Sequence, residues 1–403
     1  AGTKREEGKT TMDFDKLALE MHEKNRGKLE VTSKVELKDK VDMSTAYTPG
    51  VAEPCRKIRD NADDVYKYTV KGNMVAVVSD GTAVLGLGDI GGAAAIPVME
   101  GKSILFKTFG GVDAFPICLD TKDDEEIIRT VKNIAPVFGG INLEDIGAPR
   151  CFYIERRLKE ELDIPVFHDD QHGTAVCVLS GIINAAKVVK KDVKSLRVVL
   201  NGIGAAGSAI SKILYAYGIT NQWLVDRNGI INKEIPETML NWNHEEMANI
   251  TNPDGKQGTL ADALVGADVF IGVSKPGLVT KEMIQTMNRD AIVFAMANPT
   301  PEIFPDEAKA GGAAVIGTGR SDFPNQVNNV LVFPGLFKGA LSVRARDINE
   351  EMKMAAAEAL AAYIPENELS TENVIPYALD KKVADVIAAA VAKAAIDSGV
   401  ARV

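Results

Sequence analysis

Cysteine, histidine and long apolar runs are scarce in this sequence. The four cysteines are Cys55, Cys118, Cys151 and Cys177. They are widely spaced, form no CxxC pair and stand among apolar residues, so we expect buried free thiols in a reducing cytoplasm. No apolar run approaches the roughly 20 residues that span a bilayer, and the start lacks the apolar stretch of a signal peptide. We therefore expect no membrane partner.

A long basic block is also missing. The chain has 46 Lys and Arg against 56 Asp and Glu, which gives a formal charge of −10. Nucleic-acid binders usually carry a basic patch, so we expect no nucleic-acid partner. An acidic protein that acts on an anion must create a local positive site from a metal ion or a placed lysine.

The length and the apolar pattern predict two α/β units. A chain of 403 residues exceeds one usual hydrophobic core. In the first part, helical stretches alternate with short apolar runs, which predicts a largely parallel sheet. The helices are expected at 13–30, 123–135 and 151–161, and the strands at Met74–Ser79, Ile104–Thr108, Phe115–Leu119, Gly140–Leu143 and Ile164–Phe167.

A second unit is predicted to open near residue 172. Its elements are a helix at His172–Lys190, a strand at Leu196–Asn201, a helix to Tyr217, and strands at Gln222–Asp226, Val269–Val273 and Ile292–Met296. The Ala-rich tail predicts helices at 350–364 and 380–397. We predict a substrate and metal domain (1–168), a Rossmann-type doubly wound dinucleotide-binding domain (169–329) and a helical C-terminal segment (330–403).

The pattern GxGxxG occurs twice, and only the second copy has the context of a dinucleotide site. That copy follows an apolar strand and opens a helix, so its helix N-terminus faces the pyrophosphate, and an acid ending the next strand can bind a ribose hydroxyl. A glycine-rich turn without a ligand is the alternative. The predicted cofactor-binding residues are Gly202, Gly204, Ala205, Ala206, Gly207 and Asp226. Arg227 follows the acid directly and can accommodate a 2′-phosphate, so NAD and NADP both stay open.

The first copy, Gly86–Gly91, has a different context. It does not leave the preceding apolar run directly, because Asp80-Gly81-Thr82 intervene after that run, and Pro97 is expected to stop the following helix early. We expect this copy to serve backbone packing or a loop near the substrate.

Adjacent carboxylates appear at two predicted strand exits, as Glu144-Asp145 and Asp169-Asp170. Acids at the carboxyl ends of parallel strands can converge where ligands bind. Their mutual repulsion then calls for a cation, and oxygen ligands favour Mg²⁺ or Mn²⁺. Solvated loop acids are the alternative. From residues alone, the chain is a metal-assisted, nicotinamide-dependent enzyme, and neither Lys102 nor Tyr47 can be singled out.

Five longer motifs follow one another along the chain: Tyr47–Ala52, Leu85–Gly91, Phe167–Ala175, Ala297–Thr300 and Asn328–Gly335. Together they resemble the short, prokaryotic-type malic enzymes over nearly the whole chain. The resemblance implies oxidative decarboxylation of L-malate to pyruvate and CO₂ with NAD or NADP and Mg²⁺ or Mn²⁺. It also implies a C-terminal segment that returns to the substrate domain, and a homodimer or higher homo-oligomer.

The resemblance also implies residue roles. Glu144, Asp145 and Asp170 become the metal ligands, Lys102 the general base, Tyr47 the general acid and Asp169 the partner of the lysine, while Asn298 and Asn329 contact substrate or cofactor.

One position departs from the family pattern. Larger members carry Asp-Gly-Glu-Arg where this chain has Asp80-Gly81-Thr82-Ala83, so no guanidinium is available there for a substrate carboxylate. Backbone amides, the asparagines or a group from another subunit must replace it. The rival functions are a malolactic-type enzyme that releases lactate, an amino-acid dehydrogenase, and a non-catalytic dinucleotide-binding protein.

Overall fold

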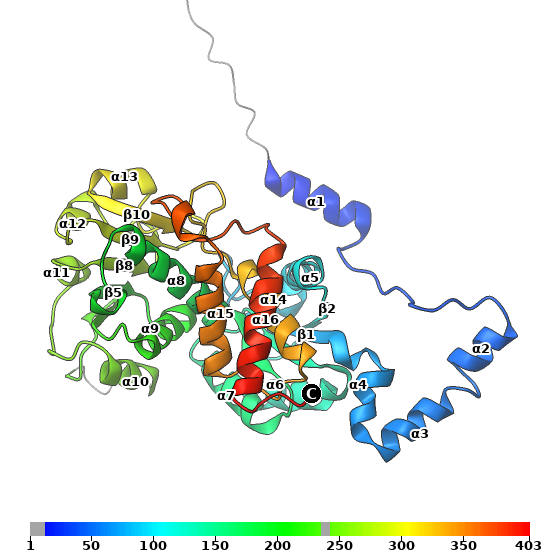
Figure 1. The fold of residues 1–403 in the computed structure, drawn as a ribbon. Coiled ribbons are helices and arrows are strands. Elements are labelled where there is room, and N and C mark those ends of the chain that lie inside the picture. The colour runs from blue at the N-terminus through cyan, green and yellow to red at the C-terminus, as the bar shows by residue number, and fades with distance from the viewer. Residues whose placement is uncertain (1–12, 235–241) are drawn as a thin grey trace, which may run out of the picture.

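The computed structural model describes residues 13–234 and 242–403. Within these ranges the chain builds two sheets with helices on their faces, and helices from the C-terminal part of the chain lie beside both units (Figure 1). This arrangement confirms the predicted α/β class with a Rossmann-type domain. The first twelve residues, which lack a signal-peptide pattern, lie outside the described residues.

The first sheet has the strand order β2-β1-β3-β4 and is parallel throughout. Its strands are β1 (Met74–Ser79), β2 (Asp113–Cys118), β3 (Gly140–Leu143) and β4 (Val166–His168). Along β1, Val75 and Val77 face one core cluster while Ala76 and Val78 face another. Burial of both faces explains why β1 is a continuous apolar run rather than an alternating one.

The second sheet has the order β10-β9-β8-β5-β6-β7, with only β7 antiparallel. Its strands are β5 (Val198–Asn201), β6 (Gln222–Asp226), β7 (Gly229–Ile230), β8 (Val269–Gly272), β9 (Ala291–Ala295) and β10 (Ala313–Thr318). From β5 the chain continues to β6 on one side and later to β8 on the other. The crevice at this switch point is where doubly wound sheets bind dinucleotides.

Helices cover both sheets and connect them. They are α1 (Phe14–Asn25), α2 (Lys40–Ala46), α3 (Ala52–Asp60), α4 (Val65–Tyr68), α5 (Gly91–Gly110), α6 (Asp124–Ile134), α7 (Arg150–Glu161), α8 (Asp169–Val188), α9 (Ala205–Tyr217), α10 (Trp242–Ile250), α11 (Leu260–Leu264), α12 (Lys281–Gln285), α13 (Pro305–Ala310), α14 (Phe333–Ser342), α15 (Glu350–Ala362) and α16 (Lys382–Asp397). Short 3-10 helices are η1 (Ala62–Asp64), η2 (Val70–Asn73), η3 (Ala135–Val137), η4 (Val193–Ser195), η6 (Asn329–Leu331) and η7 (Glu366–Glu368). Helix α14 packs on α5 and α16, and α15 packs on α8.

The predicted strand at Ile104–Thr108 is wrong, and so is the early stop at Pro97. Both lie within α5, which runs from Gly91 to Gly110 with Pro97 inside it. The buried residues of α5 recur at helical spacing: Ala95, Met99, Ser103, Phe106 and Gly110. The short apolar run is helical because α5 is packed between the first sheet and α14, so periodicity over five residues could not separate helix from strand.

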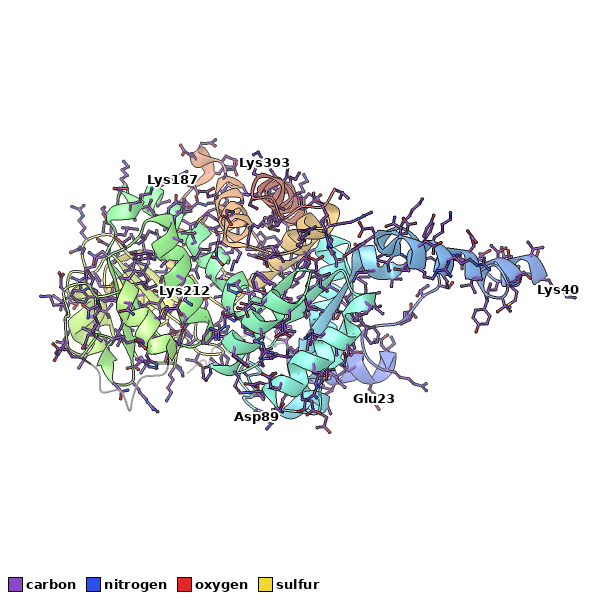
Figure 2. The ribbon with its side chains drawn as sticks, turned by 90° about the horizontal axis from the view of Figure 1, so that it is seen from below. Glu23, Lys40, Asp89, Lys187, Lys212 and Lys393 are labelled. Carbon is purple, nitrogen blue, oxygen red and sulfur yellow. The ribbon has the colours of Figure 1, made fainter. Side chains whose placement is uncertain are left out.

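The N-terminal part of the described chain forms an arm, defined here as residues 29–60. No residue from 13 to 70 is buried. Figure 1 shows α2 and α3 projecting away from the rest of the molecule, and Figure 2 shows Lys40, the first residue of α2, at the tip. A turn follows Tyr47 and is closed by a bond from the Gly50 N–H to the Ser44 carbonyl (2.8 Å).

All four cysteines are free thiols, as expected. Cys151 and Cys177 are buried, but the expectation of burial is wrong for Cys55, which is exposed because it lies on α3 of the arm. Among the described residues, no helix combines the length and the hydropathy needed to cross a bilayer.

Candidate active site

Three carboxylates converge where β3 and β4 end. The two strands are neighbours in register, with Leu143 opposite His168, so the residues that follow leave the sheet at one edge. Ligand oxygens of Glu144, Asp145 and Asp170 all lie within 4.8 Å of one another. Asp145 has a left-handed backbone (φ 53°), a conformation that non-glycine residues adopt at a cost of about 1 kcal/mol or more. Its N–H donates to Asp170 Oδ2 (2.8 Å), which fixes the turn.

The charges of this cluster repel one another. Burial, followed by the charge of Asp170, raises the pKa of Asp145 to about 8. Burial also raises the pKa of Glu144 well above its usual value, although Lys102 opposes the shift. Carboxylates grouped this closely and this deeply suit a hard divalent cation, because the cation would neutralise them and accept one oxygen from each.

Lys102 reaches the same cluster from the second half of α5. Its Nζ lies 2.7 Å from Asp169 Oδ2 and 3.2 Å from Glu144 Oε1, and its side chain is only 12% exposed. The ammonium also sits 4.2 Å from the centre of the Phe333 ring. Burial lowers the pKa of Lys102, but the carboxylates of Asp169 and Glu144 outweigh burial and raise it. Sequence physics could not find Lys102, because its role depends on a helix packing across the sheet.

Asp169 and Asp170 open α8 and divide their roles. Asp170 joins the carboxylate cluster, whereas Asp169 is fully buried and faces Lys102. Asp169 Oδ2 also accepts a bond from Asn329 Nδ2 (2.9 Å), and Asn329 Oδ1 accepts one from the Thr174 hydroxyl (3.0 Å). The structure therefore brings Asn329, from a segment 160 positions away in the sequence, to the lysine.

The buried Glu155 and the partly buried His172, which the sequence analysis did not single out, hold the β4–α8 junction. Glu155 of α7 accepts the His168 N–H (2.6 Å) on one oxygen and lies 2.7 Å from His172 Nε2 on the other. Burial by itself raises the pKa of Glu155. The interaction with His172 is the largest contribution in the other direction, and the pKa is lowered to about 2. A signal existed, since Glu155 occupies an apolar helical position between Cys151 and Leu158.

The second GxGxxG forms the turn between β5 and α9. Gly202 has φ +113°, and a Cβ there would lie 2.8 Å from the Val273 carbonyl oxygen. A Cβ on Gly207 would lie 1.9 Å from the Gly202 oxygen, so this position must be glycine. A Cβ on Gly204 would meet nothing within 4 Å, and this glycine is the N-cap of α9. The turn thus offers an open helix N-terminus of the kind that binds pyrophosphate, with Ala205 and Ala206 in its first turn.

Asp226 ends β6, which is the strand beside β5. Its carboxylate accepts the Asn228 N–H (2.8 Å) and lies 3.3 Å from His244 Nε2. Arg227 is exposed. Asn298 follows β9 at the carboxyl edge of the same sheet, next to Gly319.

The loop with the first GxGxxG borders the carboxylate cluster. The Ala83 N–H donates to the Asp145 carbonyl (3.0 Å), and the Gly147 N–H donates to the Thr82 hydroxyl (2.9 Å). This loop therefore lies beside the carboxylate cluster. The nearby Arg150 pairs with Asp80 (2.9 Å), so its guanidinium is already engaged.

Tyr47 does not join the site within its own chain. It lies on the arm and is 67% exposed. Among the described residues, no hydrogen bond joins a tyrosine hydroxyl to Lys102, Glu144 or Asp169.

A dinucleotide fold whose switch point faces a neighbouring unit with a lysine and a carboxylate cluster defines a class, the two-domain nicotinamide-dependent oxidoreductases. Comparison with known proteins identifies the family within this class. Residues 26–159 match the malic enzyme N-terminal domain, and residues 171–396 match the malic enzyme NAD binding domain.

Relatives agree with these matches. The chain is 59% identical over 392 residues to the bifunctional malic/malolactic enzyme of Bacillus subtilis (strain 168), covering 97% of this chain and 95% of that protein. It is 60% identical over 376 residues to the NAD-dependent malic enzyme of Geobacillus stearothermophilus, covering 93% and 78%. The crystal structure of a malic enzyme from Pyrococcus horikoshii Ot3 superposes with a TM-score of 0.93 at 50% identity, over 96% of this chain and 92% of that chain. The chain belongs to the malic enzyme family.

Proposed function

We propose that this chain oxidises and decarboxylates L-malate to pyruvate and CO₂ with reduction of NAD or NADP. The observation that carries the proposal is the contact between the base and the carboxylate cluster. Lys102 Nζ lies 3.2 Å from Glu144 Oε1, so a substrate hydroxyl held at the cluster is within reach of the lysine. Base catalysis needs such hydrogen-bond reach before it needs a matched pKa.

The chain's own residues have distinct tasks in this reaction. Lys102 takes the proton from the C2 hydroxyl, and Asp169 and Phe333 hold the amine in place. Asn329 fixes Asp169 and can turn its amide toward substrate or cofactor. The family resemblance gives Tyr47 the return of a proton to C3 after CO₂ leaves, and because Tyr47 lies away from the cluster of its own chain, this role requires Tyr47 of a second copy.

Glu144, Asp145 and Asp170 would hold Mg²⁺ or Mn²⁺, and the donor set of three oxygens within 4.8 Å fits such an ion. The bound ion supplies a Lewis acid for the oxygen on which negative charge develops as CO₂ departs. With Glu144 and Asp170 engaged by an ion, their share in raising the pKa of Lys102 would weaken while Asp169 stays paired with the amine, and the amine could act as a base nearer neutral pH.

The dinucleotide belongs at the switch point of the second sheet, with the pyrophosphate at Gly202, Gly204, Ala205, Ala206 and Gly207. Asp226 would bind the adenosine ribose, and Asn298 would line the nicotinamide end.

Steady-state formation of NADH or NADPH from L-malate tests the proposal, with Mn²⁺ compared against EDTA. We expect pyruvate and reduced cofactor with Mn²⁺ only. Lys102→Ala should lower kcat by at least about 100-fold, the usual contribution of a positioned base. Lys107→Ala, on the same helix but paired with Asp113 at the surface, is the control and should leave kcat unchanged. Absence of pyruvate under every combination would refute the proposed function.

A malolactic activity is the second candidate, because one relative is named a bifunctional malic/malolactic enzyme. It predicts lactate without net reduced cofactor. Quantifying lactate, pyruvate and NADH in the same reaction separates the two activities. A non-catalytic binder would bind cofactor and leave malate untouched.

We also propose the domain division 1–168, 169–329 and 330–403, a cytoplasmic location and a homo-oligomer. The free cysteines support the location, and the exposed arm supports the oligomer.

A further inference from the structure

A cavity of about 600 Å³ lies outside the carboxylate cluster. Its walls come from α7, α8, α9, α10 and the start of α15, so both sheet-bearing units and the C-terminal segment contribute to it. Helix α8 packs on α9 and on α15, and Figure 1 shows α15 beside α8. The cavity has the size of a small-molecule site. The proposed reaction gives it no task, because Lys102, Glu144, Asp145 and Asp170 do not line it.

The acids in the wall of this cavity already have nitrogen partners or contact water. Three of them lie within 3.0 Å of a nitrogen: Glu155 at His172 Nε2 (2.7 Å), Glu246 at Lys212 Nζ (3.0 Å) and Glu350 at Lys353 Nζ (2.5 Å). Glu160, the remaining acid, is exposed. Among the described residues of the wall, no buried carboxylate therefore needs a cation from a ligand.

Two buried donors in the same wall are short of acceptors. The Lys353 side chain is only 5% exposed, and an ammonium carries three N–H donors. Among the described residues its one close acceptor is Glu350, because the contact with His172 Nδ1 is long, at 3.4 Å. Gln171 is 5% exposed, and its Nε2 has no hydrogen-bond partner in the described part of the chain. Buried donors without acceptors destabilise a protein, so a ligand that brings acceptor oxygens is favoured here.

The rest of the wall is apolar. It consists of Phe152 from α7, Ala175 from α8, and Ala209 and Ile213 from α9, all of which are buried. Such a surface is better covered by hydrocarbon than by water. A ligand that suits both parts of the wall combines one anionic head with a short apolar chain. Malate, with two carboxylates and a hydroxyl, has no such chain.

From this geometry we propose that the cavity is a second ligand site of this protein, which binds a short-chain monocarboxylate. The carboxylate accepts hydrogen bonds from Gln171 Nε2 and Lys353 Nζ, and the hydrocarbon chain lies against Ala209 and Ile213. Gln171 directly follows Asp170, so the site is a neighbour of the carboxylate cluster along α8 and shares no residue with it. The proposal is independent of the proposed function, since it involves neither malate nor a dinucleotide.

Titration calorimetry of the protein in EDTA with sodium butyrate tests the chemistry of the site. EDTA ensures that butyrate cannot bind through a cation at the carboxylate cluster. We expect one butyrate per chain with a Kd of about 1 mM. Acetate, which is two methylenes shorter, should bind at least about fivefold more weakly. Propylammonium has the same propyl chain and the opposite charge, and it should not bind. Binding of propylammonium in place of butyrate would overturn the proposal, because the acids of the wall would then select the ligand.

Two substitutions test the location of the bound acid. Lys353→Met and Gln171→Leu each remove a donor and keep a side chain of similar size, so each should weaken butyrate binding at least about tenfold. Because they lie on different helices, failure of one variant to fold leaves the other as the test.

Lys187→Met is the matched control on α8 and should keep the wild-type Kd. Lys187 pairs with Glu366 at the surface, and Figure 2 shows it well apart from Lys212, which lines the cavity. Absence of butyrate binding to wild type would refute the site. An equal Kd in wild type, Lys353→Met and Gln171→Leu would refute it as well, since the acid would then bind elsewhere.

Discussion

At the scale of single residues, the site gives the neighbouring acids Asp169 and Asp170 different contacts. Asp169 is buried and forms an ion pair with Lys102. The next residue, Asp170, lies in the carboxylate cluster with Glu144 and Asp145. This division arises because the pair opens α8, where the backbone changes direction and successive side chains diverge. One short sequence motif thereby supplies both the partner of Lys102 and a member of the carboxylate cluster.

Asp170→Asn tests the repulsion within the carboxylate cluster. Removing one charge should relieve the apo-protein, so the variant should melt at a higher temperature than wild type in EDTA. Wild type should gain about 2.7 kcal/mol when Mn²⁺ stands at 100 times its Kd, and the variant should gain almost nothing. Differential scanning fluorimetry with and without Mn²⁺ measures both effects. Asp89→Asn, which changes an exposed acid paired with Lys122, is the control, and an equal loss of the Mn²⁺ response there would contradict the assignment.

Glu302 provides a pH prediction in the second domain. Burial raises the pKa of Glu302 from 4.5 to about 7, although the Ala297 N–H opposes the shift. The folded state therefore binds more protons than the unfolded state between these values, and stability falls as pH rises through this window. The loss should reach about 2–3 kcal/mol above pH 7.

Urea unfolding at pH values from about 5 to 8 measures this slope. Glu302→Gln cannot ionise and should lose the pH dependence, whereas Glu307→Gln, an exposed neighbour, should keep it. Parallel slopes for wild type and Glu302→Gln would show that Glu302 is not the titrating group.

At the scale of elements, the turn between β5 and α9 contains two glycines, Gly204 and Gly207, whose different surroundings give them different structural roles. Gly207 permits the close contact between the turn and the helix, whereas a Cβ on Gly204 would point into open space. The same substitution at the two positions therefore has different expected results.

Gly207→Ala should unfold the turn or displace it, because its Cβ would stand 1.9 Å from the Gly202 oxygen. Overpacking of this kind costs about 1–3 kcal/mol. Gly204→Ala should leave the free energy of unfolding within about 0.5 kcal/mol, since its Cβ meets open space. It should nevertheless weaken NAD and NADP binding at least about tenfold by blocking the backbone approach of the pyrophosphate. Urea unfolding and calorimetric titration check the pair, and unchanged cofactor affinity in Gly204→Ala would remove this turn from the binding site.

At the scale of the whole molecule, the C-terminal helices pack against the helix that carries Lys102. Helix α14 packs on α5, and its first residue, Phe333, lies against Lys102. On its other side α14 approaches α16 so closely that a Cβ on Gly339 would lie 2.5 Å from the Ala388 oxygen. We therefore expect a change in the distance between α14 and α16 to move Phe333 relative to Lys102.

Gly339→Ala should push α14 away from α16. We expect a loss of about 1–3 kcal/mol in stability and a fall in kcat without a matching change in cofactor affinity. Lys338→Ala, which removes only a surface ion pair with Asp385, should change stability by at most about 1 kcal/mol. Urea unfolding and steady-state kinetics provide the comparison. Wild-type kcat in a destabilised Gly339→Ala protein would show that α14 does not position Lys102.

The sequence by itself determined the α/β class, the Rossmann-type fingerprint and the placement of acids at strand exits. These features are local, since a strand, a glycine turn and a helix follow one another directly from Leu196 to Tyr217. The residue assignments beyond them came from family resemblance rather than from the physics of the chain.

Only the tertiary structure decided what lies next to Lys102. The lysine belongs to α5, of which residues 104–108 were expected as a strand from their apolar run, and its partners Glu144, Asp169 and Phe333 come from three distant segments. The structure also separated Tyr47 from the cluster that the motif pattern had joined it to. Contacts between distant segments depend on how whole elements pack, and no local spacing in the chain records that packing.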